Sequence, residues 1–443
     1  MILPSPVLLC MDKLKAAGFH SYAVGGCVRD ALLGITPHDY DLCTDARPED
    51  ICRCFEGYSL VRSGEKHGTI GVVMENQVFE ITTFRTEGGY QDSRHPGWVR
   101  FVDRLEEDLS RRDFTVNAMA FSPEEGYIDP FGGRQDLKDR RLRCVGDPAT
   151  RFTEDALRIL RGVRFAVRFS LDVETATQEA MFSLAHLMDK LAKERIFDEL
   201  CKLLPLVSAD DLLRFVPVLT QVIPELTDSV GFQQHSVHHI YDVFTHTAHV
   251  VEATPPDLVL RWAALLHDVG KPACFIMGED GHGHFHGHAQ QSAAMADSIL
   301  LRLKAPTTLR EQVTLLIRQH MTPLTPDRHI LRRRLSQYGE DTLRKMLALQ
   351  QADFGSKGTG TAAEEAVFAA METLLNQILA EDACLRVKDL AVDGRELMAL
   401  GFAPGPMLGQ CLNYLLEQIL EDRLPNEKPA LLRAAAGYLE EHI

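Results

Sequence analysis

The sequence predicts an α+β protein in which an α/β head precedes an all-helical neck, body and tail. Residues up to about 145 alternate short strand-like and helical segments, whereas helical periodicity dominates from about 150 onward. A chain of 443 residues is too long for one ordinary core. We therefore expect four domains: a head over 1–145, a neck over 146–230, a second helical domain over 231–360 and a helical tail over 361–443.

The elements of the head follow from local patterns. An amphipathic helix is expected at 11–18, before a short apolar run that ends in two glycines. Residues 68–74 and 78–84, separated by the turn-like 75–77, predict a β-hairpin. The stretch 86–97 is rich in Gly, Asp, Ser and Pro, which is typical of a mobile loop. A helix over 108–119 and a turn over 129–133 complete the head.

Composition excludes several classes of protein. Hydrophobic residues make up 45% and charged residues 25%, as in folded globular proteins, and no apolar run could span a bilayer. Ten cysteines without a C-x-x-C pair predict free thiols, a cytoplasmic protein and no zinc site built on cysteine. The net charge of −16, with basic clusters at 134–168 and 332–334, favours a discrete RNA partner, and we expect neither DNA nor a membrane as a partner.

A glycine turn and two aspartates form the first candidate site. Gly25 and Gly26 let backbone N–H groups approach a phosphate, and a helix that opens towards Arg29 favours negative charge. Asp39 and Asp41 lie two apart in a β-like segment, so their side chains face the same way. Two such carboxylates suit Mg²⁺, which activates a hydroxyl and steadies a leaving pyrophosphate. This layout is typical of a nucleotidyltransferase.

Two further motifs extend this site. Asp113 and Asn117 are four residues apart on an expected helix, beside Arg111 and Arg112, so contacts with phosphate and ribose are expected. From residue 153 a second helix carries Asp155, Arg158, Arg161 and Arg164 at intervals of three, which form one stripe. This stretch contains no acid after Asp155 until Asp172, unlike an ordinary charged helix face.

An aspartate beside an arginine could select a base. The carboxylate accepts from an exocyclic amino group, and the guanidinium donates to a ring nitrogen. Cytosine and adenine offer this pattern, whereas uracil and guanine invert it. Each buried mismatch costs about 1–3 kcal/mol, so the Asp155–Arg158 pair could accept C and A without a nucleic-acid template.

Histidines and aspartates in the second half indicate another centre. His267 and Asp268 are adjacent at the end of an apolar helix, His246 precedes them, and His288, His320 and Asp353 follow. Imidazole and carboxylate ligands spread over a helical bundle suit a divalent transition metal that activates water. Of the histidine-rich run 282–288, only His288 is expected to take part.

The head and neck resemble a class II CCA-adding enzyme, a tRNA nucleotidyltransferase of the bacterial poly(A) polymerase superfamily. The resemblance rests on residues 25–30, 39–41, 111–113, 154–158 and 194–200. It implies that Asp39 and Asp41 hold Mg²⁺, and that Gly26, Arg29 and Arg112 bind the triphosphate. It also implies that Asp155 and Arg158, supported by Arg161 and Arg164, select CTP and then ATP for addition to tRNA. The neck and tail would contact the tRNA.

Residues 235–355 resemble the HD phosphohydrolase superfamily. The resemblance implies that His246, His267, Asp268 and Asp353 are metal ligands and that His288 and His320 are auxiliary or second-metal ligands. Some CCA-adding enzymes carry such a domain with phosphatase or 2′,3′-cyclic phosphodiesterase activity, which would repair tRNA ends before the head extends them.

Alternative functions stay open at this point. A CC-adding enzyme lacks an intact loop such as 87–96, so addition of A is expected here. Poly(A) polymerases share the head but tend to be basic. A third alternative is an HD phosphohydrolase or RNA-binding factor with an idle head. The sequence leaves open the oligomeric state and whether Glu80 joins the two aspartates.

Overall fold

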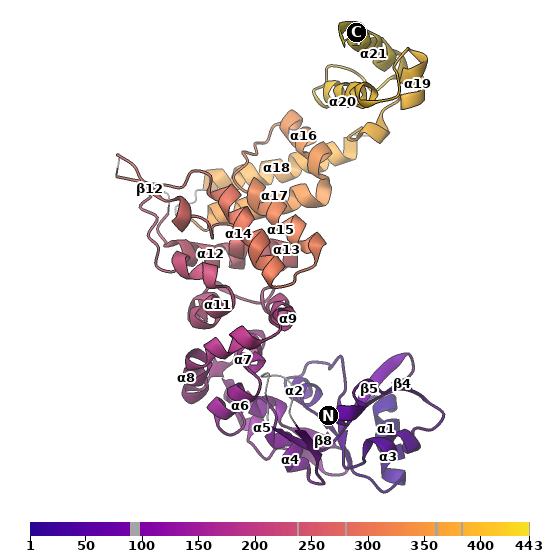
Figure 1. Ribbon diagram of the computed structural model, residues 1–443, viewed down its shortest axis with the longest axis vertical. Coiled ribbons are helices and arrows are strands. Elements are labelled where there is room, and N and C mark those ends of the chain that lie inside the picture. The colour runs from indigo at the N-terminus through magenta and orange to yellow at the C-terminus, as the bar shows by residue number, and fades with distance from the viewer. Residues whose placement is uncertain (89–97, 237–238, 280, 359–361, 382–383, 443) are drawn as a thin grey trace. The chain divides into compact units, whose positions relative to one another are not determined.

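The computed structural model describes residues 1–88, 98–236, 239–279, 281–358, 362–381 and 384–442 (Figure 1). The chain divides into two compact units, residues 1–226 with 302–304, and residues 227–301 with 305–443. The α+β class is confirmed, with the large sheet in the first unit. The described part of the chain contains no helix long and apolar enough to cross a membrane. The ten cysteines all lie in the described ranges and none forms a disulfide, as expected.

The first unit is built around a seven-stranded sheet of order β3-β4-β5-β2-β1-β8-β9. Its ladders are antiparallel except β2–β5, which is parallel. The predicted hairpin is confirmed as β4 and β5, joined at Glu75 and Asn76, which both have positive φ. The strands are β1 Ser21–Val24, β2 Leu42–Thr44, β3 Ser59–Val61, β4 Thr69–Met74, β5 Gln77–Thr83, β8 Ala120–Ser122 and β9 Gly126–Ile128.

Helices and a short ribbon flank this sheet. The helices are α1 Ser5–Ala16, α2 Gly26–Leu32, α3 Pro48–Cys54, α4 Leu105–Ser110 and α5 Gly133–Lys138. The loop prediction at 86–97 is wrong for residues 86–88, because β6 Arg85–Gly88 pairs with β7 Trp98–Phe101; its remaining residues, 89–97, lie outside the described ones. The predicted helix over 108–119 is also wrong: α4 ends at Ser110, a 3₁₀ turn covers Thr115–Asn117, and β8 follows.

Six helices complete the first unit: α6 Pro148–Glu154, α7 Leu157–Phe169, α8 Thr175–Ser183, α9 Lys193–Leu203, α10 Ala209–Arg214 and α11 Val216–Val222. Helix α7 packs against α9. The short strands β10 Arg141–Leu142 and β11 Asp172–Val173 pair in parallel on either side of α6 and α7 in the sequence. These contacts hold the helix that carries the arginine stripe against the sheet-containing part of the unit.

In the described residues of the second unit, the regular structure is helical apart from the two-residue strands β12 Ile276–Met277 and β13 Gly283–His284. Asp242 and Asp257 accept hydrogen bonds from backbone N–H groups in the first turns of α12 and α13, so each begins at a capping aspartate. Helices α12, α13, α15 and α17 pack together. The helices are α12 Val243–Ala253, α13 Leu258–Leu266, α14 His288–Arg302, α15 Thr307–Gln319, α16 Arg328–Tyr338, α17 Glu340–Gly355, α18 Ala362–Glu381, α19 Gly394–Ala399, α20 Pro406–Leu420 and α21 Lys428–His442.

Candidate functional site

A cavity of about 420 Å³ in the first unit gathers all nine residues predicted for nucleotide binding. Its wall is formed by the start of α2, the segment after α4, helix α7 and one residue of α9. The lining residues are Gly25, Gly26, Arg29, Asp41, Arg111, Arg112, Asp113, Asn117, Asp155, Leu157, Arg158, Arg161, Arg164, Phe165, Arg168 and Arg195. Asp39 is not among them.

The glycine turn lies against an arginine of the cavity. Gly25 has φ +78°, a conformation that L side chains rarely adopt, and a Cβ atom there would lie 2.9 Å from Nη1 of Arg112. Helix α2 begins at Gly26, earlier than the predicted opening towards Arg29. A side chain at position 25 would therefore displace the Arg112 guanidinium.

The two predicted magnesium ligands lie just before β2, in irregular backbone rather than in the expected strand. Asp41 is anchored by its carbonyl oxygen, which accepts a hydrogen bond from Val24 N at 2.9 Å. The pKa of the Asp41 carboxyl is raised mainly because nearby protein atoms displace water from it, although part of the residue is exposed. The charge of Arg112 lowers this pKa, whereas the charges of Glu80 and Asp39 raise it further. Three carboxylates thus repel one another here, with Arg112 as the main opposing charge.

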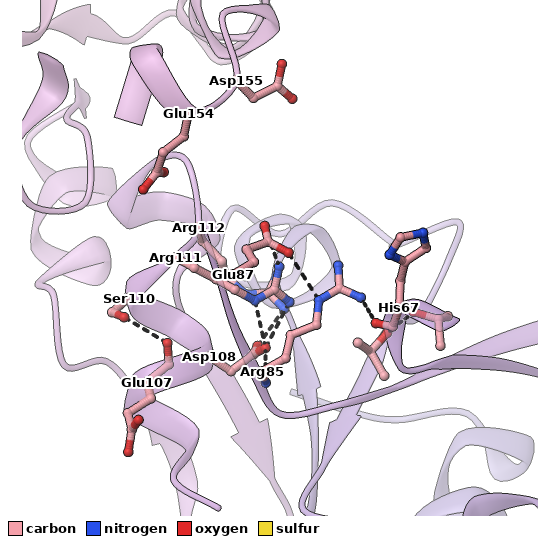
Figure 2. A network of polar contacts seen from close by, with 12 residues as sticks. His67, Arg85, Glu87, Glu107, Asp108, Ser110, Arg111, Arg112, Glu154 and Asp155 are labelled. Carbon is pink, nitrogen blue, oxygen red and sulfur yellow. Dashed lines mark hydrogen bonds and ion pairs between the residues drawn. The ribbon is translucent and has the colours of Figure 1, made fainter. Parts of the chain in front are cut away.

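A buried carboxylate that sequence reasoning missed holds the two arginines that follow α4 (Figure 2). Asp108 is fully buried, and its Oδ1 accepts from Nη2 of Arg111 at 2.8 Å and from Arg85 N at 3.2 Å. Its Oδ2 lies 3.4 Å from Nη2 of Arg112. Glu87, on β6, lies 3.4 Å from Arg111. Although burial alone would raise it, the charges of Arg111 and Arg112 lower the pKa of Asp108.

A second polar chain crosses the floor of the cavity. Asn117 accepts from Arg29 and donates to Asp113 Oδ1 at 3.1 Å, while Asp113 Oδ2 accepts from Nη2 of Arg161 at 2.7 Å. The predicted proximity of Asp113 and Asn117 is therefore present, through a 3₁₀ turn instead of an α-helix. Burial alone would raise the pKa of Asp113, but Arg161 and Asn117 hold it at about 2.

The predicted stripe on α7 is broken at its first member. Asp155 has extended backbone (φ −140°) between α6 and α7, so it does not continue the helix face of the arginines. Its Oδ2 accepts from Nη2 of Arg195, on α9, at 2.9 Å. Arg195 was missed because its role depends on a contact 40 residues away.

The arginines of the stripe also have acidic partners that the sequence pattern did not reveal. Arg158 pairs with Glu154 at 2.6 Å, on the preceding helix. Arg164 pairs with the buried Glu199 of α9 at 2.7 Å. The expected absence of acids holds along the helix itself, but the fold brings acids from other segments.

The predicted histidine centre comes together inside the second unit. The residues His246, His267, Asp268, His288, His320 and Asp353 are all buried. Two groups of side chains that could hold a metal ion occur among the described residues: His246, His267 and Asp268, and Asp268, His288 and His320, each with ligand atoms within 4.8 Å of one another. Asp268 belongs to both. Asp353 Oδ1 lies 3.0 Å from Nε2 of His246. His282, His284 and His286 belong to neither group, as expected.

Backbone carbonyl groups orient three imidazole rings of this centre. Nδ1 of His267, His288 and His320 lies 2.7, 2.8 and 2.6 Å from the carbonyl oxygens of Ala264, Phe285 and Ile317. A carbonyl only accepts, so each Nδ1 carries a proton and each ring directs its Nε2 atom towards the centre. This is the arrangement that histidine ligands of metals adopt.

Several inward atoms lack partners. His267 Nε2 and both carboxylate oxygens of Asp268 are buried without a hydrogen bond of suitable geometry, although Lys271 Nζ approaches Asp268 Oδ2 to 2.7 Å. The Nε2 atoms of His288 and His320 face each other at 3.2 Å, where two lone pairs repel. Burial and the charge of His267 lower the pKa of His320 to about 4, so its ring is neutral at pH 7. A divalent cation fits this donor set.

Comparisons with known proteins agree along the whole chain. The family model for the poly A polymerase head domain matches residues 21–143, and models for an RNA- and SrmB-binding site of polymerase A and for tRNA nucleotidyltransferase domain 2 match 170–229 and 284–435. The CCA-adding enzyme of Streptococcus gordonii is 36% identical over 440 residues, 97% of this chain and 96% of that protein.

Two further relatives support the same assignment. The CCA-adding enzyme of Latilactobacillus sakei is 34% identical over 427 residues, 96% of each chain. The crystal structure of the Bacillus stearothermophilus CCA-adding enzyme in complex with CTP has a TM-score of 0.73 and 27% identity, and covers 100% of this chain and 98% of that one. The chain belongs to the family of CCA-adding enzymes, which are tRNA nucleotidyltransferases.

Proposed function

We propose that the protein adds C, C and A to the 3′ ends of tRNA, with CTP and ATP as substrates. The carrying observation is the cavity of the first unit, where a glycine turn, Asp41 and eight arginines line one space. Membership in the family of CCA-adding enzymes supports the same reaction. An RNA 3′ hydroxyl and a nucleoside triphosphate are the reactants that such a site would bring together.

Asp39 and Asp41 are the residues that would hold Mg²⁺. Their oxygens are the ligands that Mg²⁺ prefers, and the crowding of Asp39, Asp41 and Glu80 gives a cation a favourable place. When bound, Mg²⁺ lowers the pKa of an attacking hydroxyl and neutralises charge on a leaving pyrophosphate. Gly25 and Gly26 leave room for a phosphate, and Arg112 adds positive charge beside them.

Asp155 and Arg158 would read the base. The described contacts of Arg158 use Nη1 for Arg151 O and Glu154, and Nη2 for Arg111 O, so its Nε proton and one Nη2 proton remain for a ligand. Asp155 keeps acceptor capacity beyond its bonds to Arg195 and Leu157 N. Cytosine and adenine fit this donor and acceptor; uracil and guanine do not.

The direct experiment offers purified protein a tRNA that lacks its CCA end, each nucleoside triphosphate separately and together, and Mg²⁺. Addition of C, C and one A supports the proposal. Long A tails would point to a poly(A) polymerase, and no incorporation would point to a hydrolase or RNA-binding factor with an idle head. Asp41→Asn is the matched inactive variant, because it removes a carboxylate charge without changing side-chain size.

We further propose that the histidine centre is a metal-dependent phosphohydrolase, with phosphatase or 2′,3′-cyclic phosphodiesterase activity on RNA ends. Two observations favour this second function: Asp268 is shared by two groups of potential ligands, and its oxygens are buried without a hydrogen bond of suitable geometry. His246, His267, Asp268 and Asp353 would hold one divalent transition metal, with His288 and His320 as auxiliary or second-metal ligands. When bound, such a metal supplies a water molecule with a lowered pKa.

The residues around this centre would do the rest. Hydrogen bonds from Nδ1 to backbone carbonyls orient the rings of His267, His288 and His320. Lys271 is buried, with Nζ 2.9 Å from Oε1 of Gln234 as well as 2.7 Å from Asp268. Its ammonium group therefore has a fixed position from which it could neutralise the charge of a phosphoester.

The test uses an RNA that ends in a 2′,3′-cyclic phosphate, incubated with protein and with Mn²⁺, Co²⁺, Ni²⁺ or Mg²⁺ in turn. Asp268→Asn should abolish hydrolysis and leave nucleotide addition, whereas Asp41→Asn should do the reverse. Equal loss of both activities in either variant would refute separate sites. No hydrolysis by the wild-type protein with any of the four metals would refute this second function.

A further inference from the structure

The eight arginines of the cavity differ in whether a carboxylate lies beside them. Seven of the eight lie within ion-pair distance of a carboxylate. The pairs are Arg29–Asp30, Arg111–Asp108, Arg112–Asp108, Arg158–Glu154, Arg161–Asp113, Arg164–Glu199 and Arg195–Asp155. Arg168 is the one without a carboxylate partner within the described ranges. Each of the other seven guanidiniums thus lies beside a negative charge, which Arg168 lacks in the part of the chain that the structure describes.

Arg168 lines the same cavity as the glycine turn and lies over an aromatic ring. Its Cζ lies 5.1 Å from the ring centroid of Phe169, and the Cζ of Arg29 lies 4.3 Å from the same centroid. A Cβ atom on Gly26 would lie 3.7 Å from Nη2 of Arg29. One row of contacts therefore leads from the glycine turn to Arg29, then to Phe169 and finally to Arg168.

Two like charges over one ring need an explanation. Burial lowers the pKa of Arg29, Asp30 raises it, and the charge of Arg168 lowers it again, so the two guanidiniums repel. Arg29 is buried and donates to Asp30 and Asn117, whereas Arg168 is exposed to the cavity. Arg168 thus keeps its donors for an incoming anion, and a guanidinium matches phosphate oxygens in pairs.

We propose that Arg168 is a phosphate-binding residue of the nucleotide-addition cavity, and this rests on the proposed CCA addition. The phosphate belongs either to the triphosphate of the incoming nucleotide or to the last phosphodiester of the RNA. Arg168 binds it through charge and hydrogen bonds and does not read the base. It belongs with the residues that position the reactants and takes no part in choosing C or A.

The test compares Arg168→Gln and Arg168→Lys with wild type and with Arg62→Gln, which removes an exposed charge of the same unit outside the cavity. Michaelis constants are measured for CTP, ATP and tRNA separately. Loss of a charge-assisted contact should raise the affected constant about tenfold in Arg168→Gln, and less in Arg168→Lys. Sodium tripolyphosphate, as a competitive inhibitor without a base, adds a second readout.

The pattern of changes in the three Michaelis constants shows which phosphate Arg168 binds. Parallel rises for CTP and ATP, with weaker inhibition by tripolyphosphate, support binding of the triphosphate. A rise for tRNA alone, with a smaller dependence of tRNA binding on salt, supports binding of the RNA phosphate. Constants within twofold of Arg62→Gln, or a rise for CTP without one for ATP, would overturn the proposal. A wild-type protein that adds no nucleotide would instead refute the proposed CCA addition.

Discussion

The carboxylate of Asp155 is held by the guanidinium of Arg195, with Nη2 2.9 Å from Oδ2. Asp155 occupies the break between α6 and α7, where no helix fixes its side chain, and Arg195 reaches it from α9. The proposed base-reading carboxylate therefore depends on a residue that would not itself touch the base.

Replacing Arg195 should weaken nucleotide choice more than it weakens addition. In Arg195→Met, Asp155 loses its main partner and can turn away from the base, so the ratio of kcat/KM for CTP over UTP should fall about tenfold. Arg195→Lys should recover part of the ratio. Asp155→Ala with Arg158→Ala should relax the choice further, and unchanged rejection of UTP and GTP in that double variant would place discrimination elsewhere.

Asp108→Asn should destabilise the head. The change leaves Arg111 and Arg112 without their shared buried carboxylate, and breaking a buried ion pair costs about 3–5 kcal/mol. Urea denaturation measures the free energy of unfolding. Asp103→Asn is the control, since Asp103 is 81% exposed and pairs with Arg47 at the surface; its effect should stay below about 1 kcal/mol. Equal effects of the two variants would contradict the assigned role of Asp108.

The stability contributed by Asp113 should depend on pH. Arg161 and Asn117 lower its pKa to about 2 in the folded protein, against about 3.9 in an unfolded chain. A depressed pKa stabilises the fold above the unfolded value, and this stabilisation is lost as the pH falls from about 4 to about 2. It amounts to about 2.5 kcal/mol. The gap between wild type and Asp113→Asn in urea denaturation should be constant from pH 5 to 7 and narrow below pH 4. A gap that does not narrow would contradict the lowered pKa.

Metal removal should lower the melting temperature of the second unit. A divalent cation would relieve the repulsion between the facing Nε2 atoms of His288 and His320. A ligand present at 100 times its dissociation constant raises the free energy of unfolding by about 2.7 kcal/mol. Differential scanning calorimetry before and after chelation, and after adding Mn²⁺ back, measures the shift. Asp268→Asn should show no shift, because it alters the carboxylate common to both groups. A metal-dependent shift retained in that variant would mean that the cation binds elsewhere.

Local patterns predicted the elements that depend on neighbouring residues. The hairpin of β4 and β5 forms where two strand-like segments flank the turn-like residues 75–77. The histidines and aspartates of the second centre come together as expected, because each lies at a helix end or on a buried helix face. Spacing alone was less reliable, because Asp155 does not continue the helix face of the arginines and Asp39 and Asp41 lie in irregular backbone.

Errors arose where distant segments decide the outcome. The helix predicted over 108–119 ends at Ser110, and backbone pairing with residues 143–145 shapes the segment that follows. The stripe on α7 looked unpaired because its acids come from Asp113 and Glu199. Asp108 and Arg195 were missed for the same reason, since their importance lies in contacts and not in a motif.

The carbonyls that orient His267, His288 and His320 each stand three residues earlier in the same chain. Each of these three rings thus has its tautomer set by a carbonyl of its own chain segment. For these three rings, docking of the helices requires no change of tautomer. Short-range contacts thus pre-organise three histidines of the centre, whereas Nδ1 of His246 lies 3.3 Å from the carbonyl oxygen of Ser356, 110 residues away.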